Sequence, residues 1–182
     1  MSLFLKNINM KSKKVICCLL AICLVTLFSC GIDASDYTDK VVGNYDIKVT
    51  PNLTIKYGNS NLSITAETAT TTAVVTAIDD SSDVTMQIDG VNGVINEMFF
   101  EGYCDGLGMR FQNNHYDGLF YSPEYGMIYC DIDLKNPTIS ISNSRVLSWE
   151  STVTGTCEVN VSGLDNETYT VSGKIQFYAT GK

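Results

Sequence analysis

The stretch Gly43-Asn44-Tyr45-Asp46-Ile47-Lys48-Val49 defines the fold of this chain, because its residues alternate strictly in polarity. The odd positions are apolar or small, and the even positions are polar or charged. Successive side chains point to opposite faces only in an extended strand. The pattern is therefore typical of a β-strand with one face buried and the other in water.

The same alternation recurs along the chain, and turn-forming pairs such as Asp89-Gly90 and Asn136-Pro137 separate many of the runs. The further runs span residues 53–57, 62–66, 84–88, 98–100, 107–111, 128–134, 139–141, 153–161 and 171–177. No window has the period of an amphipathic helix. Short strands with one apolar face bury it inside a closed barrel or between two sheets. We therefore expect an all-β, helix-free domain: an antiparallel meander that closes into a barrel or, as the alternative, a two-sheet β-sandwich.

A first strand with Gly43-Asn44-Tyr45, followed by a meander of short strands, resembles the calycin or lipocalin-like barrels of small bacterial lipoproteins. In that superfamily a Gly-x-Trp on the first strand packs under the barrel floor, against an Arg from near the last strand. Here Tyr45 takes the place of the Trp, and the last strand has Lys174 but no Arg. The resemblance implies a lipocalin-like barrel over residues 41–182, with Gly43 and Tyr45 in its floor.

Residues 1–29 have the pattern of a secretory signal peptide. Four lysines and no acid precede the apolar run 15–28, which is too short to span a bilayer. The end of this segment, Leu27-Phe28-Ser29-Cys30, resembles the lipobox of bacterial lipoproteins. The resemblance implies cleavage before Cys30 and a diacylglyceryl thioether on its sulfur, which anchors the protein in a membrane.

Residues 30–40 are short, polar and acidic, and we interpret them as a tether between the lipid and the fold. Gly31 follows the cysteine, where many enteric lipoproteins that stay in the inner membrane have Asp. The resemblance therefore favours the outer membrane and does not define the leaflet. Residues 41–182 remain as a single domain.

The expected mature chain is strongly acidic. The leader holds four of the twelve basic residues and none of the twenty acidic ones, so eight basic and twenty acidic residues remain, a formal net charge of −12. Such a surface repels the phosphates of nucleic acids and anionic headgroups. We expect no nucleic-acid partner, and membrane contact only through the lipid.

Three cysteines remain beyond the lipidated one: Cys104, Cys130 and Cys157. An exported protein meets oxidising conditions, and three thiols allow at most one internal disulfide, with three possible pairings. Cys130 and Cys157 alternate with aliphatic residues, where a buried thiol is equally at home. Two possibilities therefore stay open: one internal disulfide, or three buried thiols.

No catalytic or metal site is predicted. His115, the only histidine, lies in an expected turn at residues 113–117, and the chain has no Gly-x-Ser-x-Gly elbow, no zinc-binding spacing and no phosphate loop. Asp131 with Asp133, or Glu97 with Glu101, have the composition of a glycosidase pair, but a sequence does not define the distance between carboxylates. We expect no enzyme and no cofactor.

Aromatic residues concentrate between Phe99 and Tyr129, which is the best indication of a binding surface. On the inward face, bulky side chains either line a pocket for an apolar ligand or fill the core; these are Met98, Phe100, Met109 and Phe111. On the polar face, exposed side chains are suited to stacking on sugars or docking a protein; these are Tyr125, Met127 and Tyr129.

These patterns predict a non-catalytic, lipid-anchored binding protein of the cell envelope that holds a small apolar ligand in its barrel. The alternative is a surface module that binds a glycan or a protein through the tyrosine face. The ligand and the oligomeric state are not defined by the sequence.

Overall fold

The computed structural model describes residues 35–79, 81–105, 108–141, 145–159 and 168–182. The expected leader, residues 1–29, and the expected lipidation at Cys30 lie outside these residues. The described residues belong to a compact unit that begins at Ala34 and ends at Lys182. In the described part of the chain, no helix is long and apolar enough to cross a bilayer.

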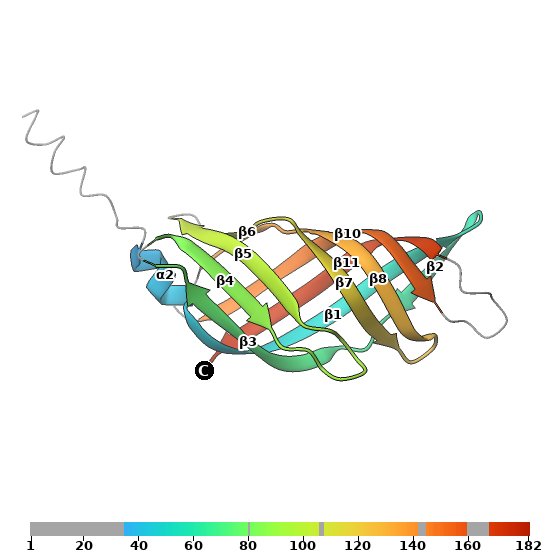
Figure 1. The fold of residues 1–182 in the computed structure, drawn as a ribbon, viewed down its shortest axis with the longest axis horizontal. Helices are drawn as coiled ribbons and strands as arrows, with labels where there is room; N and C mark the ends of the chain where they lie inside the picture. Colours follow the sequence, from blue (N-terminus) through green and yellow to red (C-terminus); the bar gives the residue numbers. More distant parts are fainter. Residues whose placement is uncertain (1–34, 80, 106–107, 142–144, 160–167) are drawn as a thin grey trace, which may run out of the picture. The chain divides into compact units, whose positions relative to one another are not determined.

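The described unit is almost entirely β-structure (Figure 1). A short helix, α2 (Ser35–Val41), precedes the strands. The strands are β1 (Gly43–Tyr57), β2 (Ser60–Thr65), β3 (Ala69–Ala77), β4 (Asp83–Ile88), β5 (Met98–Asp105), β6 (Gly108–Phe111), β7 (Asn114–Ser122), β8 (Gly126–Lys135), β9 (Thr138–Ile139), β10 (Val146–Val159) and β11 (Thr168–Gly181). Residues 43–49 and 53–57, two runs in the sequence, are one long strand because their alternation stays in phase across Pro51.

The strands form one antiparallel sheet that closes into a barrel. The order along the sheet is β7-β8-β10-β11-β1-β3-β4-β5-β6-β9, and β2 pairs with β1. β6 and β7 are parts of one strand interrupted at residues 112–113, and β8 and β9 are parts of another interrupted at 136–137. Arg110 pairs with Thr138 and Asn114 with Leu134, so one register continues across both interruptions. The two ends of the path therefore meet, and the predicted lipocalin-like barrel is confirmed over the sandwich.

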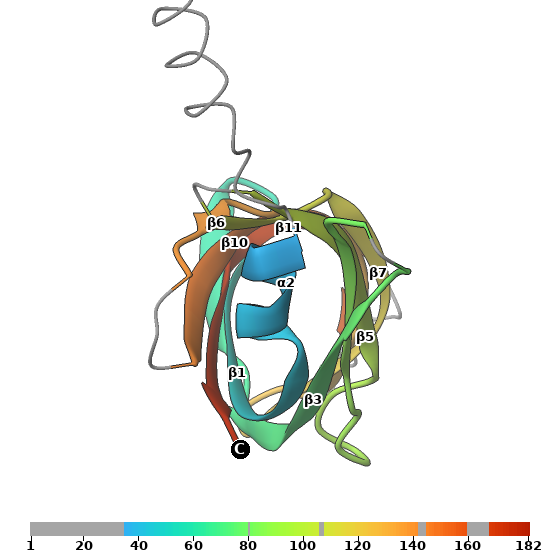
Figure 2. The same cartoon turned by 90° about the vertical axis from the view of Figure 1, so that its left-hand side faces the viewer.

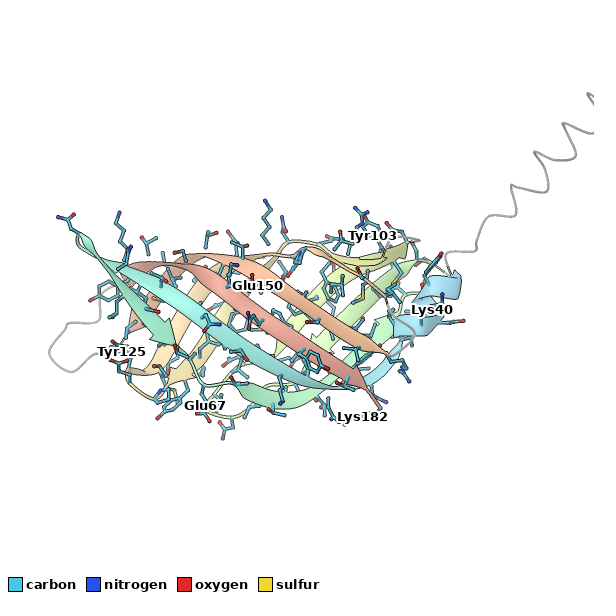
Figure 3. The ribbon with its side chains drawn as sticks, turned by 180° about the vertical axis from the view of Figure 1, so that it is seen from behind. Lys40, Glu67, Tyr103, Tyr125, Glu150 and Lys182 are labelled. Atoms are coloured by element: carbon cyan, nitrogen blue, oxygen red, sulfur yellow. The ribbon has the colours of Figure 1, made fainter. Side chains whose placement is uncertain are left out.

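Different strands pair with β1 at the two ends of the barrel. The first half of β1 pairs with β3, whereas the second half pairs with β2. Figure 3 places Lys40 and Lys182 at the end near α2, and Glu67 and Tyr125 at the opposite end. At that opposite end, the Glu67 amide donates to the Tyr121 carbonyl over 2.6 Å and joins the segment after β2 to β7.

The expectation of a helix-free domain behind a tether ending at residue 40 is wrong for residues 35–41. These residues form α2, which lies at one end of the barrel (Figure 1), in front of its opening in the view of Figure 2. Thr38 and Val41 are buried there, and Tyr37 packs against the core. A helix this short depends on such docking rather than on its own propensity, so its sequence carries no clear helical period.

The barrel floor contains Gly43 and Tyr45, and the cation that covers them is Arg145. The Tyr45 hydroxyl donates to the Val41 carbonyl over 2.6 Å, and the Arg145 guanidinium lies 5.7 Å from the ring centroid. Arg145 also donates to the Val42 carbonyl, and a Cβ on Gly43 would collide with its guanidinium. Lys174, the cation available on the last strand, instead pairs with Glu150, 2.5 Å away on the outer surface.

Candidate functional site

The four inward candidates, Met98, Phe100, Met109 and Phe111, are all buried. The Phe100 ring lies 5.0 Å from that of Phe111 and 5.6 Å from that of Phe177. Trp149, which sequence reasoning did not single out, stacks on Phe177 at 4.5 Å. These rings contact one another in the geometries of a packed core, so the described interior is filled with side chains here.

A surface depression of about 370 Å³ opens where β5 and β7 diverge. It arises at the interruption between β6 and β7, where side chains replace ladder hydrogen bonds. The Asn136 amide donates to the Gln112 carbonyl over 2.7 Å and to the Asn114 side chain over 3.0 Å. The buried Ser151 hydroxyl donates to the Asn136 side-chain oxygen over 2.5 Å. This network joins the interruption between β6 and β7 to the interruption between β8 and β9 and to β10.

Tyr116 connects β7 to the segment before β5. Its hydroxyl accepts from the Asn96 amide over 3.2 Å and donates to the Leu119 carbonyl over 3.0 Å. A Cβ on Gly118 would collide with this ring, so the glycine makes room for it. Burial raises the pKa of the Tyr116 phenol, and it remains a neutral donor at physiological pH.

The wall of this β5–β7 depression combines one exposed ring with carboxylates, amides and an imidazole. Phe99 is 50% exposed. The polar groups around it come from Glu97, Glu101, Gln112, Asn113, Asn114, His115 and Asp117. The Asn114 amide donates to the Phe99 carbonyl over 3.1 Å, and this bond connects β7 to β5 across the depression.

A second depression, of about 480 Å³, lies over β8 and β10 and is lined by Tyr129, Asp131, Thr156 and Glu158. Tyr129 is 54% exposed. Asp117 lines this β8–β10 depression and the β5–β7 depression alike, so the two are neighbours on the outer surface.

The three outward candidates differ in how exposed they are. Met127 and Tyr129 are exposed as expected, and the Tyr129 hydroxyl lies 3.9 Å from the Met127 sulfur. Tyr125 is only half-buried and packs against the core, with its hydroxyl donating to Glu124 over 2.9 Å. The exposed rings in these two depressions are therefore Phe99 and Tyr129, and Tyr125 is not one of them. The alternation of Phe99 with buried Met98 and Phe100 is the signal that identifies Phe99 as outward.

His115 lies in β7 and not in a turn, which corrects the expectation for residues 113–117. Strand continuity with β8 sets this position, since His115 pairs with Asp133 in the ladder. Its ring nitrogens lie 3.3 Å from Asp131 and 3.2 Å from Asp133. These two carboxylates therefore share one imidazole. Glu97 and Glu101, the other pair considered, both line the β5–β7 depression.

Fold and site together define an antiparallel β-barrel with polar depressions on its outer wall. Three of these depressions contain an exposed ring, namely Phe99, Tyr129 and Tyr178, and the first two depressions are neighbours that share Asp117. Comparison with protein-family models, with curated proteins and with solved structures finds no match. Within the described residues, no group of three or more His, Cys, Asp or Glu side chains is arranged to hold a metal ion.

Proposed function

We propose that this protein is a non-catalytic, lipid-anchored binding protein of the cell envelope that binds glycans on its outer wall. The observation that carries the proposal is the placement of two exposed rings, Phe99 and Tyr129, in neighbouring depressions that share Asp117. The C–H face of a sugar packs against an aromatic ring, whose face is electron-rich. Carboxylates and side-chain amides beside the ring accept from and donate to the sugar hydroxyls.

Anchoring at Cys30 and an outer-membrane location remain part of the proposal, supported by the lipobox-like Leu27-Phe28-Ser29-Cys30. A surface with net negative charge keeps the domain clear of anionic headgroups. The contact of Arg145 with Gly43 and Tyr45 supports the calycin resemblance, because an arginine next to the last strand takes the position that the superfamily pattern requires.

A small apolar ligand inside the barrel is the second candidate function. One observation favours it: the buried indole N–H of Trp149 has no hydrogen-bond partner among the described residues. A ligand acceptor beside Trp149 would satisfy this donor. The packing of Phe100 and Phe111 around it makes this the weaker candidate, since the rings must move to admit a ligand.

Phe99→Ala and Tyr129→Ala are each expected to weaken glycan binding roughly tenfold, which corresponds to about 1.4 kcal/mol of lost stacking. Retention of the detergent-solubilised protein is measured on a glycan array and on immobilised amylose and peptidoglycan. Because both positions are exposed, the free energy of unfolding is expected to change by less than about 0.5 kcal/mol.

Tyr103→Ala is the matched control, since Tyr103 is 40% exposed on β5 and lines neither of these depressions nor the one beside Tyr178. Its retention is expected to equal that of the unmodified protein. Equal loss in all three variants would indicate nonspecific aromatic contact, and unchanged retention in Phe99→Ala and Tyr129→Ala would exclude the depressions as the glycan site.

Cys30→Ser is expected to move the protein from the membrane fraction to the soluble fraction. The acyl chains attach to the Cys30 sulfur, and serine offers no thioether. Fractionation with a carbonate wash measures the change, and Cys104→Ser serves as the control that leaves membrane attachment intact. The lipoprotein assignment fails if the serine variant, expressed without residues 1–29, stays with the membranes.

A further inference from the structure

We propose that Cys130 and Cys157 form a disulfide that joins β8 to β10 in the exported protein, and that Cys104 stays a thiol. The export proposed above enters only as the source of an oxidant. In the structure all three cysteines are free and buried, and the pairing rests on where the barrel places them.

Cys130 and Cys157 are direct partners in the β8–β10 ladder. Both side chains are buried, so they leave the sheet on the same, inward face. Opposite residues of antiparallel strands have Cα atoms about 4.5 or 5.5 Å apart. Both separations fall within the range of about 4.4–6.8 Å that a disulfide spans. The bond therefore needs no change of register.

Cys104 has no such partner. It lies on β5 and is paired with Met109 of β6, away from the β8–β10 ladder. Of the three pairings that the cysteine count allows, the topology brings one pair together. The neighbours of the pair in the same row are Gly118 on β7 and Tyr169 on β11, so no third thiol lies beside it.

The oxidant required is a disulfide-bearing thiol oxidoreductase of the cell envelope. The thiolate of one cysteine attacks the oxidant disulfide, forms a mixed disulfide and releases one oxidant thiolate. The thiolate of the second cysteine then attacks the sulfur of the first, and the oxidant leaves as a dithiol. The two cysteines lose two protons and two electrons, and the oxidant gains both.

Burial determines when this exchange takes place. It raises the pKa of Cys130 to about 12 and that of Cys157 to about 11, so neither is a thiolate at neutral pH once the barrel is closed. Oxidation is therefore expected while β8 and β10 are still accessible during folding. The same burial protects the finished disulfide from reduction.

The test is peptide mapping of the full chain, with free thiols blocked by N-ethylmaleimide in denaturant at cell harvest so that buried thiols also react. Trypsin places Cys104, Cys130 and Cys157 on separate peptides, residues 57–110, 111–135 and 146–174. We expect the second and third peptides to be linked and the first to be alkylated. A parallel sample is unfolded, reduced and refolded with a glutathione redox pair. The linked protein is expected to melt roughly 10 °C higher than the reduced one.

The double variant that carries both Cys130→Ala and Cys157→Ala is the matched control. Its melting temperature is expected to be insensitive to reductant. Cys104→Ala should keep the linkage and the reductant-sensitive shift. A linkage found after refolding but absent from cells supports the pair and contradicts the proposed export. Separate alkylation of residues 111–135 and 146–174 in both samples, or a linkage that includes Cys104, overturns the pair.

Discussion

Tyr45→Ala is expected to lower the free energy of unfolding by about 3–5 kcal/mol, the usual cost of deleting a buried aromatic side chain. Tyr45 is fully buried at the barrel floor, and its ring separates the interior from Arg145. The substitution removes this packing and leaves the Val41 carbonyl without its donor. It also removes one of the contacts between α2 and the barrel. Urea unfolding followed by tyrosine and tryptophan fluorescence measures the change.

Tyr45→Phe separates the ring from the hydroxyl. It keeps the packing and removes only the hydrogen bond to Val41, so a loss of about 1–3 kcal/mol is expected. Tyr178→Ala deletes an exposed ring of the same type and should change stability by less than about 0.5 kcal/mol. A loss under about 1 kcal/mol for Tyr45→Ala would be incompatible with Tyr45 as part of the floor.

Phe100→Ala is the second large expected effect, again about 3–5 kcal/mol. The Phe100 ring is fully buried and meets Phe111, Trp149 and Phe177 at 5.0, 6.0 and 5.6 Å between centroids. Its removal leaves a cavity that these rings cannot close without leaving their packing geometry. The melting temperature and the free energy of unfolding both measure the loss.

Phe99→Ala is the control next to it in the chain. The same atoms are deleted on the opposite face of β5, where the ring is half exposed, so stability should change by less than about 0.5 kcal/mol. The Phe100→Ala and Phe99→Ala variants together also distinguish the two candidate functions. A stable Phe100→Ala protein that has lost binding of a fluorescent fatty acid would favour a ligand inside the barrel over a filled core.

Much of the fold could be predicted because strand alternation is a local property. The phase of residues 43–49 places Tyr45, Ile47 and Val49 inside, and all three are buried. The same reasoning assigns Phe99 to the outside and Phe100 to the inside. It does not predict α2, since a helix of this length is stabilised by docking and leaves little periodicity.

The candidate binding surface could be predicted only in part from the sequence. Tyr129 and Met127 could be placed outside from their phase, whereas Tyr125 at the end of a hairpin packs partly on the core. Gln112 and Asn114, which line the β5–β7 depression, are bonded to Asn136 more than twenty residues away. No local pattern identifies such a contact.

The sequence by itself determined that the chain is built of strands, which side of each strand is buried, and that Gly43 and Tyr45 belong to the first strand, because these properties follow from a two-residue repeat. Only the tertiary structure decided that the sheet closes, that Phe99 and Tyr129 lie in neighbouring depressions, and that Cys130 faces Cys157. It also decided that Arg145 covers the floor, bonding to Val42 across 103 positions of sequence. Such pairings depend on which strands become neighbours, and that is set by the burial of the whole core rather than by any one segment.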